Sequence, residues 1–394
     1  MHWTGFPFGV RAGAGGLLTL QKQRSAKRPS AVSFTVRFFL MSTALVLTLG
    51  CQRSLPPAPP PPKTVETKVV FLAVGDIMLS RGVARVMDRA NDPLLPFRKL
   101  EAVLRSTDFN FGNLESPFSG NDKILGHDKI FNTHTRDMVG LTQFNFKVLN
   151  LANNHALDQN LRGIQNTQRY LKEHEIISLG TGDNLADAWQ PQVITINALK
   201  IGFIGASYAS VNDGGVTRND YVARIDDVDK LKSAITQLKS QADFIVVMMH
   251  AGTEFVAKAD PARALDKGQI DFAHAAIDHG ADLVIGAHPH WIQNLETYSG
   301  KYIFYSLGNF IFDMHDPVAN EGLVLRITLH GEKTINPAVS ASNGEQGVKF
   351  ITGIEQIECL PVIIENYGTP RLASETEASR ILTRMGLPQR LSSR

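Results

Sequence analysis

The chain has 394 residues, of which 43% are hydrophobic, an ordinary composition for a globular protein of one or two domains. Its 40 basic and 38 acidic residues leave a formal net charge of +2. This balance gives no electrostatic basis for a nucleic-acid partner, and we expect none.

The first residues have the pattern of an export signal. The first 40 positions carry several basic residues and no acidic one, and an apolar stretch follows from Phe38 to Gly50. That stretch is shorter than the roughly 20 residues that a membrane-spanning helix needs, and its basic flank is typical of a secretory signal. Cys51 directly follows it and resembles the lipidated first residue of a bacterial lipoprotein, although Thr48 departs from that pattern. We therefore expect residues 1–51 to be a signal segment and the protein to be exported and lipid-anchored in the cell envelope; simple cleavage of the signal is the alternative.

The segment after Cys51 is rich in proline. Residues Pro56–Pro62 favour an extended polyproline conformation and are unsuited to a helix or a central strand. We expect residues 52–67 to be a linker, residues 68–315 to form the main domain, and residues 316–394 to add C-terminal strands and a tail.

From Lys68 onward, short runs of apolar and β-branched residues each end in a polar or glycine-containing cluster. The runs are Val69–Val74, Phe109–Gly112, Val148–Ala152, Phe244–Met249, Leu283–Ile285 and Tyr302–Leu307. Such runs are typical of strands buried on both faces. Helical patterns occur at Ile164–Leu171, Val228–Leu238 and Ile270–Ile277, and further strands are expected at Leu323–Leu329 and Val348–Ile357. The alternation predicts an α/β fold with helices packed on sheets.

The polar clusters predict one functional site. In open α/β sheets, ligands bind beyond the carboxyl ends of the strands. A single polar residue at such a position usually caps a helix or begins a turn, but five clusters together indicate convergence. They supply carboxylate, amide and imidazole groups from Asp76, Glu115, Asn154, His155, His250, His288 and His290.

This mixture of side chains is suited to divalent metal ions. Carboxylate, imidazole and amide ligands favour Mn, Fe or Zn, and the lack of thiolate ligands argues against structural zinc. Two neighbouring ions can hold a phosphoryl group and activate a hydroxide, and a histidine that is not a ligand can protonate the leaving group. His288 and His290 are expected on the same side of an extended segment stiffened by Pro289.

The segments GDIMLSRGV, NLESP, LANNHALD, MMHAGTEF, GAHPH and YSLGNFIF resemble, in this order, those of the CapA family, which is named for capsule and poly-γ-glutamate synthesis. The resemblance covers roughly Lys68 to Asp313. That family is similar to the calcineurin-like metallophosphoesterases, so the resemblance implies a four-layer α-β-β-α sandwich with two sheets flanked by helices.

The resemblance also implies roles for individual residues. Asp76, Asn154, His250, His288 and His290 would be metal ligands, Glu115 would bridge the two ions, and His155 would be catalytic. The phosphoesterase pattern has a histidine where this chain has Met78, and an aspartate where it has Glu115. We therefore expect one half of the site to have fewer ligands, with one or two ions bound.

Four other residues near these clusters are candidates for substrate or supporting contacts. Asp158 is expected either to orient His155 or to cap the following helix. Arg81 is suited to an anionic substrate group, with a surface position as the alternative. Glu254 follows His250 closely, and Asn309 is expected either to line the pocket or to cap a turn.

These observations leave three functions open. The first is a metal-dependent, phosphoesterase-like hydrolase acting on an anionic exopolymer or its precursor in capsule or poly-γ-glutamate biosynthesis. The second is a polymer assembly or export factor that uses the site for binding and works beside a membrane synthase. The third is a metal- or solute-binding lipoprotein. The fold alone does not choose among them.

Overall fold

The computed structural model describes residues 61, 63–123, 126–208, 219–254, 265–336 and 347–392, all within the compact unit Ala58–Arg394. The predicted signal segment, Cys51 and most of the predicted linker lie outside the described residues. Among the described residues, no helix is long and apolar enough to cross a membrane.

The first sheet is built around the long strand β1. Its strand order is β14 (Thr369–Leu372), β13 (Gly347–Glu365), β12 (Glu321–Asn336), β1 (Lys63–Ile77), β2 (Phe109–Leu114), β3 (Phe146–Asn150) and β4 (Ile177–Leu179). Strand β11 (Asn309–Ile311) pairs in parallel with the end of β1, and β15 (Arg390–Ser392) pairs with β13. Strand β1 begins inside the range expected to be linker, because Lys63–Thr67 pairs antiparallel with β12 and this pairing satisfies its backbone groups.

The second sheet is mostly parallel. Its order is β5 (Gln192–Ile196), β6 (Leu199–Ser207), β7 (Phe244–His250), β8 (Leu283–Ala287), β10 (Lys301–Phe304) and β9 (Leu295–Tyr298). The prediction of one strand over Tyr302–Leu307 is wrong in one respect, because β10 ends at Phe304. The chain then leaves the second sheet and enters the first as β11, and Gly308 (φ +66°) lies at this crossing.

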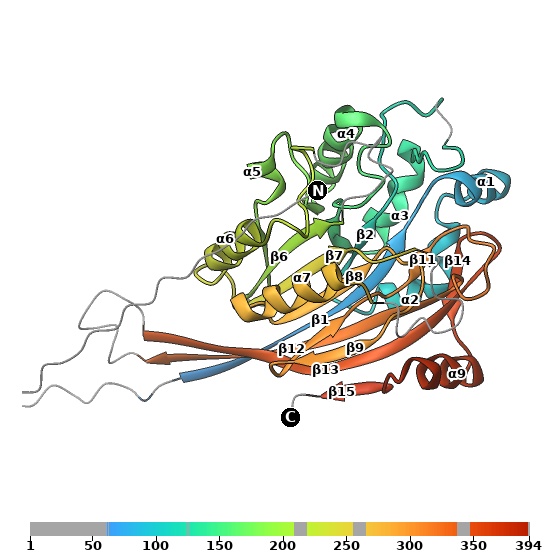
Figure 1. Ribbon diagram of the computed structural model, residues 1–394. Helices are drawn as coiled ribbons and strands as arrows, with labels where there is room; N and C mark the ends of the chain where they lie inside the picture. Colours follow the sequence, from blue (N-terminus) through green and yellow to red (C-terminus); the bar gives the residue numbers. More distant parts are fainter. Residues whose placement is uncertain are drawn as a thin grey trace, which may run out of the picture. The chain divides into compact units, whose positions relative to one another are not determined.

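Helices cover the outer face of each sheet (Figure 1). Those on the first sheet include α1 (Arg81–Ala90), η1 (Leu95–Leu100), α3 (Val139–Gln143) and α4 (Asn160–Glu173); those on the second include α6 (Val228–Leu238) and α7 (Lys267–His279). The remaining helices are α2 (Glu101–Leu104), η2 (Thr135–Met138), α5 (Leu185–Ala188) and α9 (Glu375–Met385).

Three hydrophobic interfaces define the layers. On β1, Phe71 and Ala73 face the second sheet, where they join Phe203 and Val246 in one core. The alternating residues of β1 join the helices on the opposite face in a second core, and a third core lies between the second sheet and α6 and α7. Three interfaces separate four layers, so the predicted α-β-β-α sandwich is confirmed.

The C-terminal stretch, expected as a tail, forms helix α9. Ser374 and Glu377 form a reciprocal capping box at its start, and Gly386 ends it in the left-handed conformation. Arg380 and Arg384 pair with the largely buried Glu321 at the start of β12. The helix is therefore fixed to the strands that extend the first sheet.

Candidate metal centre

The seven predicted site residues converge at one edge of the sandwich. Asp76 is the next-to-last residue of β1, Glu115 follows β2, and His250 ends β7. All seven are almost completely buried; the others are Asn154, His155, His288 and His290, in the loops after β3 and β8. The carboxyl ends of parallel strands from both sheets therefore bring them together, as the sequence predicted.

One group of donor atoms surrounds the His250 side chain. Its Nε2 lies 2.8 Å from Asn154 Oδ1, 3.1 Å from His288 Nδ1 and 3.8 Å from Glu115 Oε1. Imidazole, amide and carboxylate donors, which are the ligand types that divalent cations take in proteins, therefore meet around His250 Nε2.

A second group contains Asp76, Glu115 and His290, whose ligand atoms lie within 4.8 Å of one another. Asp76 Oδ2 lies 3.6 Å from His290 Nδ1. Met78 adds no ligand here, because its sulfur is buried and accepts a hydrogen bond from the Ser80 N–H at 3.1 Å. Glu115 belongs to both groups, and the second has fewer ligands.

Glu115 is the site residue whose surroundings best fit a neighbouring cation. Both of its carboxylate oxygens are buried and have no hydrogen-bond partner among the described residues. Burial, followed by the nearby Asp76 and Glu254 carboxylates, holds the pKa of Glu115 well above its ordinary value. A buried carboxyl group without partners is costly unless it is neutral or bound to a cation. The donor set around it therefore fits a divalent metal ion.

The histidines are held in the form that binds metals. Burial is the main cause that lowers the pKa of His250 and His288 well below the ordinary value, and it also lowers that of His290. Burial raises the pKa of Asp76, against the opposing effect of His290. Neutral imidazole is the metal-binding form, so deprotonation costs little here at neutral pH.

The loop after β8 is not the extended segment that the sequence suggested. His288 and His290 have φ values of +103° and +65°, which are strained for residues with a side chain. His288 contacts the His250 group, whereas His290 lies beside Asp76 and Asn309. The turn therefore places the two imidazoles in different halves of the centre.

Asn113 belongs to the site, although the sequence interpretation omitted it. Its Nδ2 donates to Asp76 Oδ1 at 2.7 Å and lies 3.0 Å from His250 Nδ1, and its Oδ1 accepts from Asn150 at 2.9 Å. It thereby links side chains from the two sheets. Its position two residues before Glu115, on the same side of an extended segment, was the available signal.

His155 lies beside the centre and is held by Asp158. Its Nδ1 is 2.7 Å from Asp158 Oδ2, and its Nε2 is 3.7 Å from Glu115 Oε1. The structure therefore brings Asp158 to His155, in the arrangement expected of an orienting carboxylate.

The three other candidates also lie near the site. Glu254 Oε1 accepts from Asn154 Nδ2 at 3.5 Å and is 3.7 Å from His288 Nδ1. Asn309 Oδ1 is 2.9 Å from His290 Nδ1. Arg81 pairs with Asp313 through Nη2 and donates from Nη1 to the Asp128 carbonyl at 2.6 Å, so both of these nitrogens are engaged within the protein.

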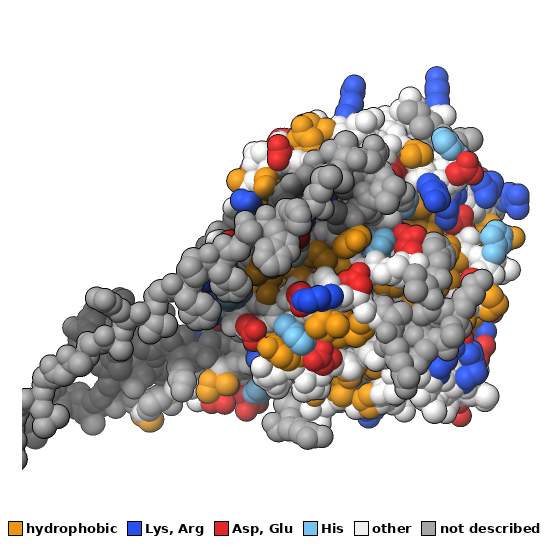
Figure 2. Space-filling view, in the orientation of Figure 1, with side chains coloured by type: hydrophobic (Ala, Val, Ile, Leu, Met, Phe, Trp, Pro, Cys, Tyr) orange, Lys and Arg blue, Asp and Glu red, His pale blue; other side chains and the backbone are white. Residues whose placement is uncertain are grey.

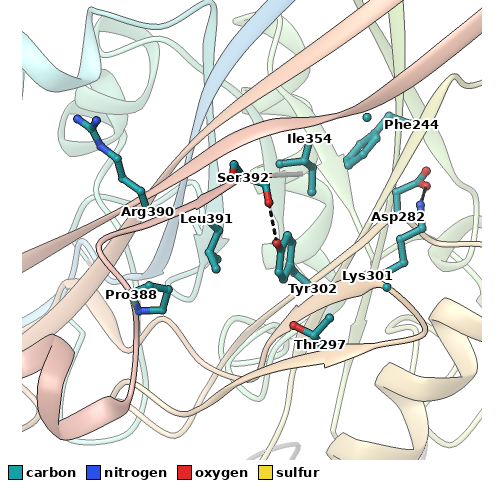
Figure 3. Close-up of a pocket in the computed structure, with 12 residues that line it drawn as sticks. Phe244, Asp282, Thr297, Lys301, Tyr302, Ile354, Pro388, Arg390, Leu391 and Ser392 are labelled. Atoms are coloured by element: carbon teal, nitrogen blue, oxygen red, sulfur yellow. Dashed lines mark hydrogen bonds and ion pairs between the residues drawn. The ribbon is translucent and has the colours of Figure 1, made fainter. Parts of the chain in front are cut away.

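A large cavity of about 820 Å³ lies elsewhere (Figure 3). It is lined by Phe244 and Asp282, at the opposite ends of β7 and β8 from the histidines. Two of its cations are paired, Lys301 with Asp282 at 2.6 Å and Arg390 with Glu358 at 3.0 Å. The buried, unsatisfied carboxylate of Glu115 makes the strand-end centre the stronger candidate.

A second group of metal-ligand types consists of Asp88, His134 and Asp137. Arg136 pairs with both Asp88 and Asp137, so a cation from the chain itself already serves this cluster. Over the described part of the face shown in Figure 2, acidic and basic side chains are interspersed. The mixture of charges on that face agrees with the nearly equal numbers of basic and acidic residues in the sequence.

Comparisons with known proteins confirm the resemblance seen in the motifs. Residues 70–314 match the family described as "Bacterial capsule synthesis protein PGA_cap". The chain is 30% identical to the capsule biosynthesis protein CapA of Bacillus anthracis, over 75% of this chain and 72% of that protein. It is 31% identical to the PGA biosynthesis protein CapA of Bacillus subtilis, over 75% and 76% of the two chains. Among solved structures, it is similar to the calcineurin-like phosphoesterase YfkN of Bacillus subtilis, with 13% identity, coverage of 82% and 97%, and a TM-score of 0.40.

Proposed function

Because the chain belongs to the PGA_cap family of bacterial capsule synthesis proteins, we propose that it is an exported, metal-dependent hydrolase of a phosphoester-type bond. The substrate is an anionic exopolymer or its precursor. The protein is anchored to a membrane through Cys51 and acts beside a polymer synthesis system.

One observation carries the proposal of metal-dependent chemistry. Glu115 is completely buried, has no hydrogen-bond partner among the described residues, and lies between two groups of carboxylate, imidazole and amide donors. A divalent ion bound at such a site supplies Lewis acidity and lowers the pKa of a bound water molecule. The donor chemistry is suited to Mn, Fe or Zn.

His155 is the residue best placed to transfer a proton. Its Nδ1 is fixed on Asp158, so the opposite nitrogen, Nε2, points toward Glu115 at 3.7 Å. Asp158 stabilises the protonated imidazole that would donate to the leaving oxygen. Asn154, the residue directly before His155, belongs to the His250 donor group, so the proton donor and a metal-ligand candidate share one loop.

The test is the hydrolysis of bis-p-nitrophenyl phosphate and p-nitrophenyl phosphate with added Mn²⁺. His155→Gln is expected to lower kcat by roughly 10²- to 10⁴-fold without changing the number of bound ions, since proton transfer typically contributes that factor. His174→Gln, at an exposed histidine near the end of α4, is the matched control and should retain activity. Equal activity of wild type and His155→Gln would contradict the assigned role.

Met78 favours a second candidate function. The phosphoesterase pattern has a histidine at this position, and the buried thioether leaves the Asp76 half with fewer ligands. A site that binds metal and polymer without turnover would serve an assembly or export factor. Metal binding in a wild-type protein that hydrolyses neither ester would favour this second function.

A further inference from the structure

We propose that Phe131 is a positioning residue for His155 and that Arg81 and Asp313 hold Phe131 in place. The inference rests on the proposed function, in which His155 transfers a proton. Phe131 is itself buried and contacts no metal-ligand candidate in the ring contacts of the described residues.

Phe131 contacts both members of the His155–Asp158 pair. Its ring stacks on the His155 imidazole with a centroid distance of 3.8 Å and an interplanar angle of 17°. Its backbone N–H donates to Asp158 Oδ2 at 2.6 Å, the same oxygen that lies 2.7 Å from His155 Nδ1. Its carbonyl accepts from Gln159 Nε2 at 2.8 Å. The side chain and backbone of Phe131 therefore hold its segment against the loop that carries His155 and Asp158.

Arg81 connects the Phe131 ring to the segments that follow β1 and β11. Its guanidinium carbon lies 4.6 Å from the centroid of the Phe131 ring and 5.6 Å from that of Phe312. Asp313 pairs with Arg81 and accepts from the Gly82 N–H at 2.7 Å. The residues that follow β1 and β11 are thus joined through Arg81 to the ring that covers His155. Arg81 therefore supports the Phe131 ring through its own contact with Asp313.

The arrangement restricts the imidazole to one orientation. A parallel ring at 3.8 Å opposes rotation of the His155 plane, and Asp158 anchors Nδ1. Nε2 is then the nitrogen that faces the metal centre. Without the ring, His155 would sample other orientations, and the proton on Nδ1 would be less strictly held. Stacked aromatic pairs contribute enough for about a tenfold effect.

The experiment compares Phe131→Leu with Tyr298→Leu in the full chain. Tyr298 stacks on His274 at the same centroid distance, 3.8 Å, and at 6°, away from the site, so it is a matched control. ¹⁵N NMR of histidine-labelled, metal-free protein reports the tautomer of His155. The His155 signals are identified as those that disappear in His155→Gln. Kinetics with bis-p-nitrophenyl phosphate and Mn²⁺ supply a second measurement.

In wild type and Tyr298→Leu, we expect the His155 signals of a single tautomer protonated on Nδ1. In Phe131→Leu the His155 signals should move toward the average of the two tautomers, and kcat should fall about 10-fold at unchanged KM. Phe131→Tyr, which keeps the ring, should restore the signals and kcat. If Phe131→Leu does not fold, Phe131→Met removes the ring with a flexible apolar replacement.

Unchanged His155 signals in a folded ringless variant would overturn the inference. If wild type hydrolyses no ester, the proposed catalytic function fails, and the NMR result alone still decides whether Phe131 positions His155.

Discussion

Replacing Glu115 with glutamine is expected to raise the melting temperature of the metal-free protein near neutral pH. The same replacement should abolish most of the binding of added divalent cations. Glutamine has nearly the same shape but carries no charge. The wild-type carboxylate is completely buried without a hydrogen-bond partner among the described residues, so its ionised form is costly. Metal-dependent hydrolysis should fall by more than about 100-fold, beyond the range typical of residues that only support ligands.

The pH dependence of this effect has a definite sign. Burial raises the pKa of Glu115 in the folded protein above its ordinary value of 4.5. Between these two pKa values the folded protein keeps a proton that the unfolded chain has released, so its stability falls as the pH rises. Glutamine does not ionise, and the stability difference between variant and wild type should therefore widen as the pH rises from 5 into the alkaline range.

The measurement is thermal unfolding in EDTA across that pH range. Glu173→Gln is the matched control, because Glu173 is exposed and pairs only with Arg169 on the surface of α4 among the described contacts. A melting temperature that is the same for wild type and Glu115→Gln throughout the range would contradict the account of Glu115.

Gly75→Ala is expected to destabilise the protein by about 3 kcal/mol, the upper end of what overpacking costs. A Cβ at Gly75 would overlap with the carbonyl oxygen of Gly308, the residue directly before β11. That same oxygen accepts a hydrogen bond from the Asp76 N–H at 3.1 Å. The substitution should therefore displace Asp76 as well, and lower metal affinity by about 10-fold or more.

Gly353→Ala provides the control for Gly75→Ala. Gly353 also lies in a strand of the first sheet, but nothing lies within 4 Å of a Cβ added there. Chemical denaturation of the two variants should show a loss of stability only for Gly75→Ala. Similar unfolding free energies for both would show that β1 and β11 can separate without cost.

The sequence predicted an α/β fold and the convergence of the site because both follow from strong local patterns, whereas the four-layer arrangement was implied by the family resemblance. Buried parallel strands are recognisable as continuous apolar runs, and polar residues at their carboxyl ends meet at one edge. For this reason, side chains as distant in sequence as Asp76 and His288 were correctly expected together. The backbone N–H of His288 donates directly to Asp76 Oδ2 at 3.1 Å.

What the sequence did not predict depends on backbone conformation and tertiary contacts. The positive φ values of His288 and His290 run against the preference of residues with side chains, so an extended segment was the natural expectation. The crossing between sheets after Phe304 is hidden, because the apolar run continues to Leu307. The stacking of Phe131 on His155 joins the loop after β3 to a segment that directly follows no predicted strand, and no local pattern marks it.

The most direct test of the central claim is the number of metal ions per chain, measured by elemental analysis after equilibration with Mn²⁺ or Zn²⁺ and removal of free metal. We expect at least one ion on the wild-type protein, a second, weaker one at higher metal concentration, and loss of the tighter ion in folded Glu115→Gln. A wild-type protein without bound metal, or a Glu115→Gln variant with the same number of ions, would contradict a metal centre built around Glu115.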